Sequence, residues 1–388
     1  MIRVHPVGTT IYQPESCFNG YTLVSAKGGV KLITMNGDTA HGWPTDRNGT
    51  RGFIHRARLL ANGHLMILVG QTDDTHGYIE EYDWDSRSVW QYTPRAGEPH
   101  HGFWPQACGS VLLICRKPIP EEHVQKARDP ARRANIVYDD VLIEVSRAKE
   151  VVWEWHQHQH LDIDWCNPIP ASRDWPAGPD NNTITDWTHT NTIQALPPNR
   201  WYDKGDERFK PGNVLISMRQ LDTILIVDRD SGEIAWSYTG DHYGGMSGQH
   251  ESHMIEKGIP GEGNIIVFDN GASPYKDLAH AGCSFVLEVN PVSKQVVWVY
   301  DDQRRFYSTF TSNCQRLPNG NTLIFETICR RIFEVTAEKE IVWEHVTQEN
   351  AQRVFRYPYD FCPQTAALPK PKELPVKPPE ELRIAPSL

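Results

Sequence analysis

The sequence lacks the features that mark several classes of protein. It holds no run of about 18 apolar residues that would span a bilayer, and its first residues contain no apolar stretch typical of an export signal. It also lacks a basic cluster: 49 acidic residues face 39 Lys and Arg, for a formal charge of −10. We therefore expect a soluble, cytoplasmic protein that binds neither nucleic acid nor a membrane.

Cysteine pairs with metal-ligand spacing are also missing. The eight cysteines are widely scattered and none forms a CxxC pair, which argues against a zinc ribbon and leaves no disulfide framework. There is no HExxH motif either. We expect reduced cysteines in the hydrophobic core, no resident metal and no cofactor.

What the sequence does contain is an internal repeat of roughly 45 to 60 residues, a period typical of propellers and related arrays. Each of five copies has a Leu or Ile, a polar turn and an apolar strand, followed by a second strand, a turn and a strand that holds tryptophan. The last copy reads "QRLPNGNTLIFETI" and then "RIFEVTAEKEIVWEH". Residues 21–43 form an incomplete sixth copy, and residues 354–369 contain the strand that it lacks.

This pattern predicts an all-β fold, a six-bladed β-propeller closed by strands from both termini. Short strands at regular spacing, without a convincing amphipathic helix, are typical of that architecture. The propeller would span residues 21–369, after an N-terminal segment at 1–20. We expect a long loop insertion at 157–187. The proline-rich residues 370–388 would form an extended tail on the surface or on a partner in a homo-oligomer.

Superposing the repeats aligns one position at the start of each innermost strand. Because innermost strands surround the central channel, residues at this position are expected to converge at one of its mouths. A lone histidine is usually structural, whereas several in register indicate a polar site. The aligned residues are His55, His101, Asn191, His250 and Ser312, with His100 beside His101 and His189 two residues before Asn191.

Arginines extend this candidate site. Arg219 follows an inner strand, where a guanidinium requires an anionic partner, either a substrate or a structural carboxylate. Arg331 has a similar place in the last repeat, and His253 lies three residues beyond His250. No carboxylate pair or clear carboxylate partner accompanies these residues, so a metal site is the weaker explanation. Histidines with arginine favour acid–base or nucleophilic chemistry on an anionic ester or acid.

Three stretches of the sequence resemble the arylsulfotransferase family, the bacterial aryl-sulfate sulfotransferases that do not use the nucleotide PAPS. They are "DWTHTNTIQALP" with "NVLISMRQ", "GQHESHMI" with "GNIIVFDNG", and "QRLPNGNTLIFE". The similarity extends over residues 8–365. It implies a six-bladed propeller that works by a ping-pong scheme, in which a sulfuryl group passes from an aryl sulfate to a phenol through a histidine.

The resemblance also implies roles for individual residues. The QH motif makes His250 the nucleophile, HxN makes His189 and Asn191 sulfate ligands, SxR makes Arg219 a charge clamp, and the HH element makes His101 an acid/base. We therefore predict a catalytic set and a substrate-binding set. The catalytic set is His250, His101, His189 and Arg219; the binding set is Asn191, His55, His100, Ser312, His253 and Arg331.

Two alternative functions stay open at this point. The first is a propeller lyase or glycosidase acting on an acidic saccharide, with histidine as acid or base and Arg219 holding a uronate carboxylate. The second is a non-catalytic propeller that binds an anion at the same site. An unsaturated product from uronate oligosaccharides would favour the first, and tight binding without turnover would favour the second.

Overall fold

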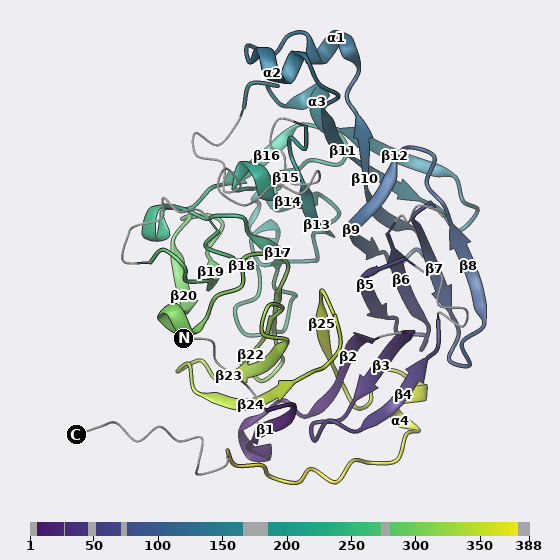
Figure 1. Ribbon diagram of the computed structural model, residues 1–388, viewed down its shortest axis with the longest axis vertical. Coiled ribbons are helices and arrows are strands. Elements are labelled where there is room, and N and C mark those ends of the chain that lie inside the picture. The colour runs from purple at the N-terminus through teal and green to yellow at the C-terminus, as the bar shows by residue number, and fades with distance from the viewer. Residues whose placement is uncertain are drawn as a thin grey trace.

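The computed structural model describes residues 6–26, 28–45, 52–70, 76–165, 185–272 and 280–378. Their strands form six antiparallel sheets that follow one another around a central axis (Figure 1). The predicted six-bladed β-propeller is therefore confirmed.

Five blades follow one another along the chain, each named here from its innermost strand outward. The first is β5 (Ile54–Leu59), β6 (Leu65–Val69), β7 (Tyr78–Tyr82) and β8 (Ser88–Tyr92). The second is β9 (Glu98–Pro105), β10 (Val111–Pro118), β11 (Tyr138–Val145) and β12 (Val151–His156). The third is β13 (Thr190–Ala195), β14 (Val214–Met218), β15 (Thr223–Val227) and β16 (Ile234–Tyr238). The fourth is β17 (His250–Met254), β18 (Ile265–Asp269), β19 (Phe285–Val289) and β20 (Val296–Tyr300), and the fifth is β21 (Asn313–Arg316), β22 (Thr322–Glu326), β23 (Arg331–Val335) and β24 (Ile341–Val346).

The sixth blade closes the ring with strands from both ends of the chain. Its innermost strand β25 (Val354–Pro358) pairs antiparallel with β2 (Gly20–Ala26), which continues into β3 (Gly29–Ile33) and β4 (Thr39–Trp43). The predicted closure is confirmed. The structure adds a strand that the sequence did not indicate: β1 (Gly8–Tyr12) pairs with β24 and widens the fifth blade to five strands. The C-terminal segment in turn bonds to β1, through Val376 and Tyr12.

The repeating tryptophan explains how adjacent blades are joined. In every blade its indole N–H donates to a backbone carbonyl in a turn of the next blade, at 2.7–3.1 Å. The middle strands pack between blades, so β14 and β18 are buried at every residue. Each blade thus covers the apolar face of its neighbour. The six tryptophans are Trp43, Trp90, Trp153, Trp236, Trp298 and Trp343.

The described helices are short, and none is long and apolar enough to cross a membrane. The predicted loop at 157–187 begins as a helical turn and ends with Trp187 buried in the core, while residues 166–184 lie outside the described part. The α-helices are α1 (Glu121–Val124), α2 (Pro130–Arg133), α3 (Gln157–His160) and α4 (Pro363–Ala366). The 3-10 turns are η1 (Pro14–Ser16), η3 (Tyr202–Lys204), η4 (Glu207–Phe209), η5 (Arg219–Leu221), η6 (His242–Gly244) and η7 (Gln303–Arg305).

The cysteines only partly follow the expectation of a buried, reduced set. Cys115, Cys314 and Cys362 are buried and form no disulfide, and burial raises the pKa of the Cys314 thiol well above its usual value. Cys108 is exposed in the turn before β10, so placing it in the core was wrong. Cys166 lies outside the described residues.

Candidate functional site

Irregularities in the innermost strands give the site its shape. Strands β5, β9, β13 and β17 each break register with the next strand near the start, at or beside the aligned residues. In β5, for example, Ile54 and Arg56 pair with consecutive residues of β6, which leaves His55 as an extra residue. Such a bulge bends the strand and re-aims the side chain. The side chains at the aligned positions therefore do not follow the alternation between faces that an ordinary strand shows.

Two bulged residues and one that precedes β13 have left-handed backbone conformations. The φ angles are 54° at His101, 50° at Glu251 and 48° at His189. Non-glycine residues hold this conformation at a cost of about 1–3 kcal/mol, and such strain concentrates at functional sites. These three strained positions lie at or beside the predicted histidines.

Four of the predicted histidines form one cluster. The ring centre of His101 lies 4.8 Å from that of His100, 4.7 Å from that of His189 and 5.4 Å from that of His55. Burial, followed by the charge of His189, holds the pKa of His101 well below its usual value. Burial also lowers the pKa of His55 to about 4. Both imidazoles are therefore neutral near pH 7.

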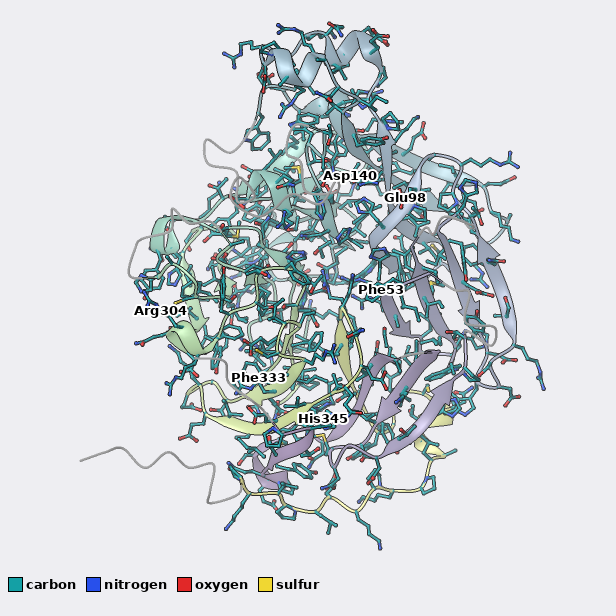
Figure 2. The ribbon with its side chains drawn as sticks, viewed as in Figure 1. Phe53, Glu98, Asp140, Arg304, Phe333 and His345 are labelled. Atoms are coloured by element: carbon teal, nitrogen blue, oxygen red, sulfur yellow. The ribbon has the colours of Figure 1, made fainter. Side chains whose placement is uncertain are left out.

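A carboxylate anchors this cluster from an outer strand. Asp140 of β11, labelled in Figure 2, accepts a hydrogen bond from His100 Nε2 at 2.6 Å, and His100 Nδ1 lies 2.6 Å from His101 Nδ1. The other oxygen of Asp140 accepts from the Thr188 hydroxyl and the Thr190 amide. Burial alone would raise the pKa of Asp140, but His100 and these hydrogen bonds lower it. Asp140, His100 and His101 thus form a chain along which a proton can pass.

A second carboxylate holds His189. Asp186 Oδ2 lies 2.5 Å from His189 Nδ1, an arrangement that leaves Nε2 free for a ligand. The expectation that no carboxylate partner accompanies the histidines was therefore wrong. The sequence did not point to Asp140 and Asp186, because their distances in sequence from the aligned positions follow no repeat. Among the described residues, no group of three or more His, Cys, Asp and Glu side chains has the geometry of a metal site.

His250 is held in one tautomer. Its Nδ1 lies 3.0 Å from the Gly248 carbonyl and 2.7 Å from Asn270 Oδ1. A backbone carbonyl only accepts, so Nδ1 carries the proton and Nε2 carries the lone pair. Asn270 is fixed in turn, because its amide donates to the carbonyls of Ser308 and Thr311. Burial, then the charges of Arg353 and Arg219, hold the pKa of His250 well below its usual value.

Arg219 brings a buried cation to the same place. Its backbone N–H donates to the His189 carbonyl at 3.1 Å, and a side chain built on Gly248 would lie 4.0 Å from its Nε. Burial lowers the pKa of Arg219, although an arginine stays charged. Within the described ranges no carboxylate forms an ion pair with it; its one hydrogen bond is a long one to Gln220, at 3.4 Å. The alternative of a structural salt bridge therefore has no partner here.

Asn191 and Gln249 connect the third and fourth blades. The Asn191 amide donates to the Gln249 carbonyl at 2.7 Å, and the Gln249 side chain donates to Ser217 and the Met218 carbonyl. Both side chains are fully buried. These bonds set the position of β17 relative to β13, and with it the position of His250.

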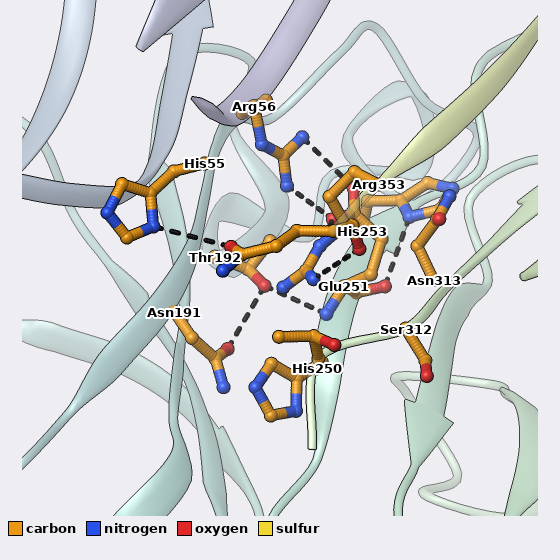
Figure 3. A network of polar contacts seen from close by, with 12 residues as sticks. His55, Arg56, Asn191, Thr192, His250, Glu251, His253, Ser312, Asn313 and Arg353 are labelled. Carbon is orange, nitrogen blue, oxygen red and sulfur yellow. Dashed lines mark hydrogen bonds and ion pairs between the residues drawn. The ribbon is translucent and has the colours of Figure 1, made fainter. Parts of the chain in front are cut away.

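The channel contains a buried ion cluster that the sequence did not indicate. Glu251 is paired by both terminal nitrogens of Arg56 and, at 3.0 Å, by Arg353 Nε (Figure 3). Arg353 immediately precedes β25, the innermost strand of the closing blade. Extending the superposed repeats to that sixth strand would have pointed to it.

Three predicted binding residues are held by other parts of the fold. Ser312 bonds to Ser308 at 2.8 Å, and His253 Nδ1 lies 3.3 Å from the Glu251 carbonyl. Arg331 is on β23, the third strand of its blade, where its Nε bonds to Glu344 at 2.5 Å. No contact described here joins these three to the histidine cluster. The histidine cluster therefore consists of His55, His100, His101 and His189. His250 is close enough to affect the pKa of His101, and Arg219 is close enough to affect the pKa of His250. Asn191 bonds to the residue directly before His250.

One end of the channel thus brings together three neutral histidines, His55, His101 and His250, with buried carboxylates and an arginine that forms no ion pair with any described residue. The sequence profile of Arylsulfotransferase (ASST) matches residues 56–348, so the chain belongs to the arylsulfotransferase family of sulfotransferase-type enzymes. No curated protein matches the sequence.

Solved structures resemble the chain at low sequence identity. A protein of unknown function from Bacteroides caccae has a TM-score of 0.52 and 12% identity, over 87% of this chain and 98% of that one. A virginiamycin B lyase from Staphylococcus aureus has a TM-score of 0.45 and 8% identity, over 89% of this chain and 90% of that one. The first likeness supports the propeller fold alone.

Proposed function

We propose that this protein moves a sulfuryl group from an aryl sulfate to a phenol through a sulfohistidine on His250. The observation that supports this most is the fixed tautomer, which gives Nε2 of a neutral imidazole a lone pair beside an unpaired guanidinium. The family supports sulfotransferase chemistry, and the nucleophile and the substrates are the proposal.

In the first half-reaction, His250 Nε2 bonds to sulfur as the bond between sulfur and the aryl oxygen breaks. Negative charge in the transferring group spreads over its oxygens, where the Arg219 guanidinium stabilises it more than in the bound ester. The departing phenolate takes the Nε2 proton of His101. His100 starts with a proton on each ring nitrogen, and the Asp140 carboxylate stabilises its positive charge. It then passes its Nδ1 proton to His101 Nδ1.

In the second half-reaction, the oxygen of a new phenol attacks sulfur. The bond between Nε2 and sulfur breaks, and its electron pair returns to His250. The phenol proton passes to His101 Nε2, and the Nδ1 proton of His101 returns to His100. The enzyme and the positions of its protons are then the same as before the first half-reaction.

The test is release of 4-nitrophenol from 4-nitrophenyl sulfate, with and without phenol. We expect release that depends on phenol and parallel lines in double-reciprocal plots, because a covalent intermediate separates the two half-reactions. A folded protein that binds the ester without releasing product would favour the anion-binding propeller. An ultraviolet-absorbing product from uronate oligosaccharides would favour the lyase.

Asp140→Asn tests the proton relay. An amide cannot stabilise a cation on His100, so we expect kcat to fall by roughly 10²-fold. The high-pH limb of the pH–rate profile, where the rate falls because the relay proton is lost, should move to lower pH. Asp139→Asn is the matched control, since Asp139 is adjacent on β11 but bonds to His158 at 2.8 Å. Equal loss in both variants, with unchanged pH profiles, would refute the relay.

A further inference from the structure

A separate cavity opens toward the C-terminal ends of the innermost strands, away from the histidine cluster. Its volume is about 110 Å³. Its wall includes Arg58 near the end of β5, Trp104 near the end of β9, Gln194 near the end of β13 and Gln315 near the end of β21. The aligned histidines stand at the opposite, N-terminal ends of β5 and β9. The buried Glu251 cluster lies between the two regions and lines the cavity at its inner end.

Arg58 is the unusual residue of this cavity. Its guanidinium carbon lies 4.3 Å from the ring centre of Trp104 and 4.7 Å from that of Phe355, so two aromatic faces hold it in place. Within the described part of the chain it forms neither a hydrogen bond nor an ion pair, and its Nε is buried without a partner. Arg58 as a whole is half-buried, and a guanidinium nitrogen that is buried without a partner costs free energy. An anion that reaches the guanidinium would reduce this cost.

The other cations around the cavity already have partners. Arg316 bonds to Glu288 at 2.6 Å, and Arg353 is paired with Glu251. Burial lowers the pKa of His253 to about 4, so this imidazole adds no charge near pH 7. The remaining acid of the wall, Glu256, is exposed at the rim.

The shape and lining of the cavity restrict the class of ligand. One unpaired cation matches one negative charge, and the planar fork of a guanidinium fits a carboxylate through two parallel hydrogen bonds. The side chains of Ile255 and Ile259 provide apolar wall beside it. The volume is below the roughly 150 Å³ of a cavity that admits benzene, so a short alkyl chain fits better than a ring.

We propose that this cavity is a second ligand site, in which Arg58 binds the carboxylate of a short-chain aliphatic acid. The argument uses none of the residues of the proposed sulfuryl transfer. Either proposal can therefore fail while the other stands.

The test is calorimetric titration of butyrate into the full chain at pH 7. We expect saturable binding that weakens at least tenfold in Arg58→Gln and is unchanged in Arg219→Gln, whose substitution lies in the histidine site. Glu256→Gln should bind more tightly, because a rim carboxylate that repels the ligand is gone. Arg58→Lys should fall between wild type and Arg58→Gln, since it keeps the charge and loses the fork.

Several outcomes would overturn the proposal. They are no detectable binding to wild type, equal binding to Arg58→Gln, or loss of binding in Arg219→Gln. Inorganic sulfate that binds as tightly as butyrate, and depends equally on Arg58, would overturn the carboxylate class. Circular dichroism of each variant shows whether the fold is intact, and Glu256→Gln tests the site without altering the stacked arginine.

Discussion

His250→Ala is expected to abolish phenol-dependent release of 4-nitrophenol, with a loss of at least roughly 10³-fold in kcat. The substitution removes the atom proposed to carry the sulfuryl group. In wild type mixed with the aryl sulfate alone, mass spectrometry should detect a protein heavier by one SO₃ on the peptide that holds His250. The variant should show no such adduct.

The matched control is His160→Ala. His160 is an exposed histidine of α3 whose ring stacks on Trp155 at 4.8 Å. It should keep wild-type turnover, and both variants should keep the wild-type circular dichroism. Turnover that survives in His250→Ala, or an adduct on a different residue, would contradict the assignment of the nucleophile.

Glu251→Gln is expected to lower the free energy of unfolding by about 3–5 kcal/mol, the cost of leaving a buried ion pair without one partner. Arg56 and Arg353 would then be two buried cations that share no anion. Urea denaturation measures the change. Glu338→Gln, on an exposed turn, is the control and should differ from wild type by no more than about 0.5 kcal/mol. A similarly small effect of Glu251→Gln would show that the ion cluster contributes little.

The same carboxylate should make stability depend on pH. Burial alone would raise the pKa of Glu251, but Arg56 and Arg353 outweigh it and lower the pKa from 4.5 to about 2. The folded-state pKa is the lower one, so the stabilisation is complete above pH 4.5 and is lost as the pH falls toward 2. Wild type should therefore lose stability more steeply across this range than Glu251→Gln. Equal slopes for the two proteins would contradict the shift.

Three arginines of the channel, Arg353, Arg219 and Arg58, differ in whether the protein supplies an anion for them. Arg353 has its carboxylate within the protein, so it contributes to stability and to the low proton affinity of His250. Arg219 and Arg58 have none among the described residues, so they are the cations that are able to take an anion from outside. Arg219 begins the turn η5 after β14, whereas Arg58 is near the C-terminal end of β5, so their ligands can be tested separately.

The sequence by itself determined the architecture and the positions that meet at the axis. The period of the repeat and the spacing of its tryptophans can be read from short stretches of sequence. They recur in each blade because each indole must reach a turn of the next blade. The register of the repeats likewise placed His55, His101 and His250 in one group.

Only the tertiary structure decided which charges accompany those histidines. Asp140 belongs to a third strand and Asp186 to the segment before β13, so no spacing connects them with His250. The bulges that turn the aligned side chains have no signature in hydrophobic alternation, because they depend on pairing with a neighbouring strand. Ring closure brings these separate segments to one axis, and there their charges set the protonation of the histidines.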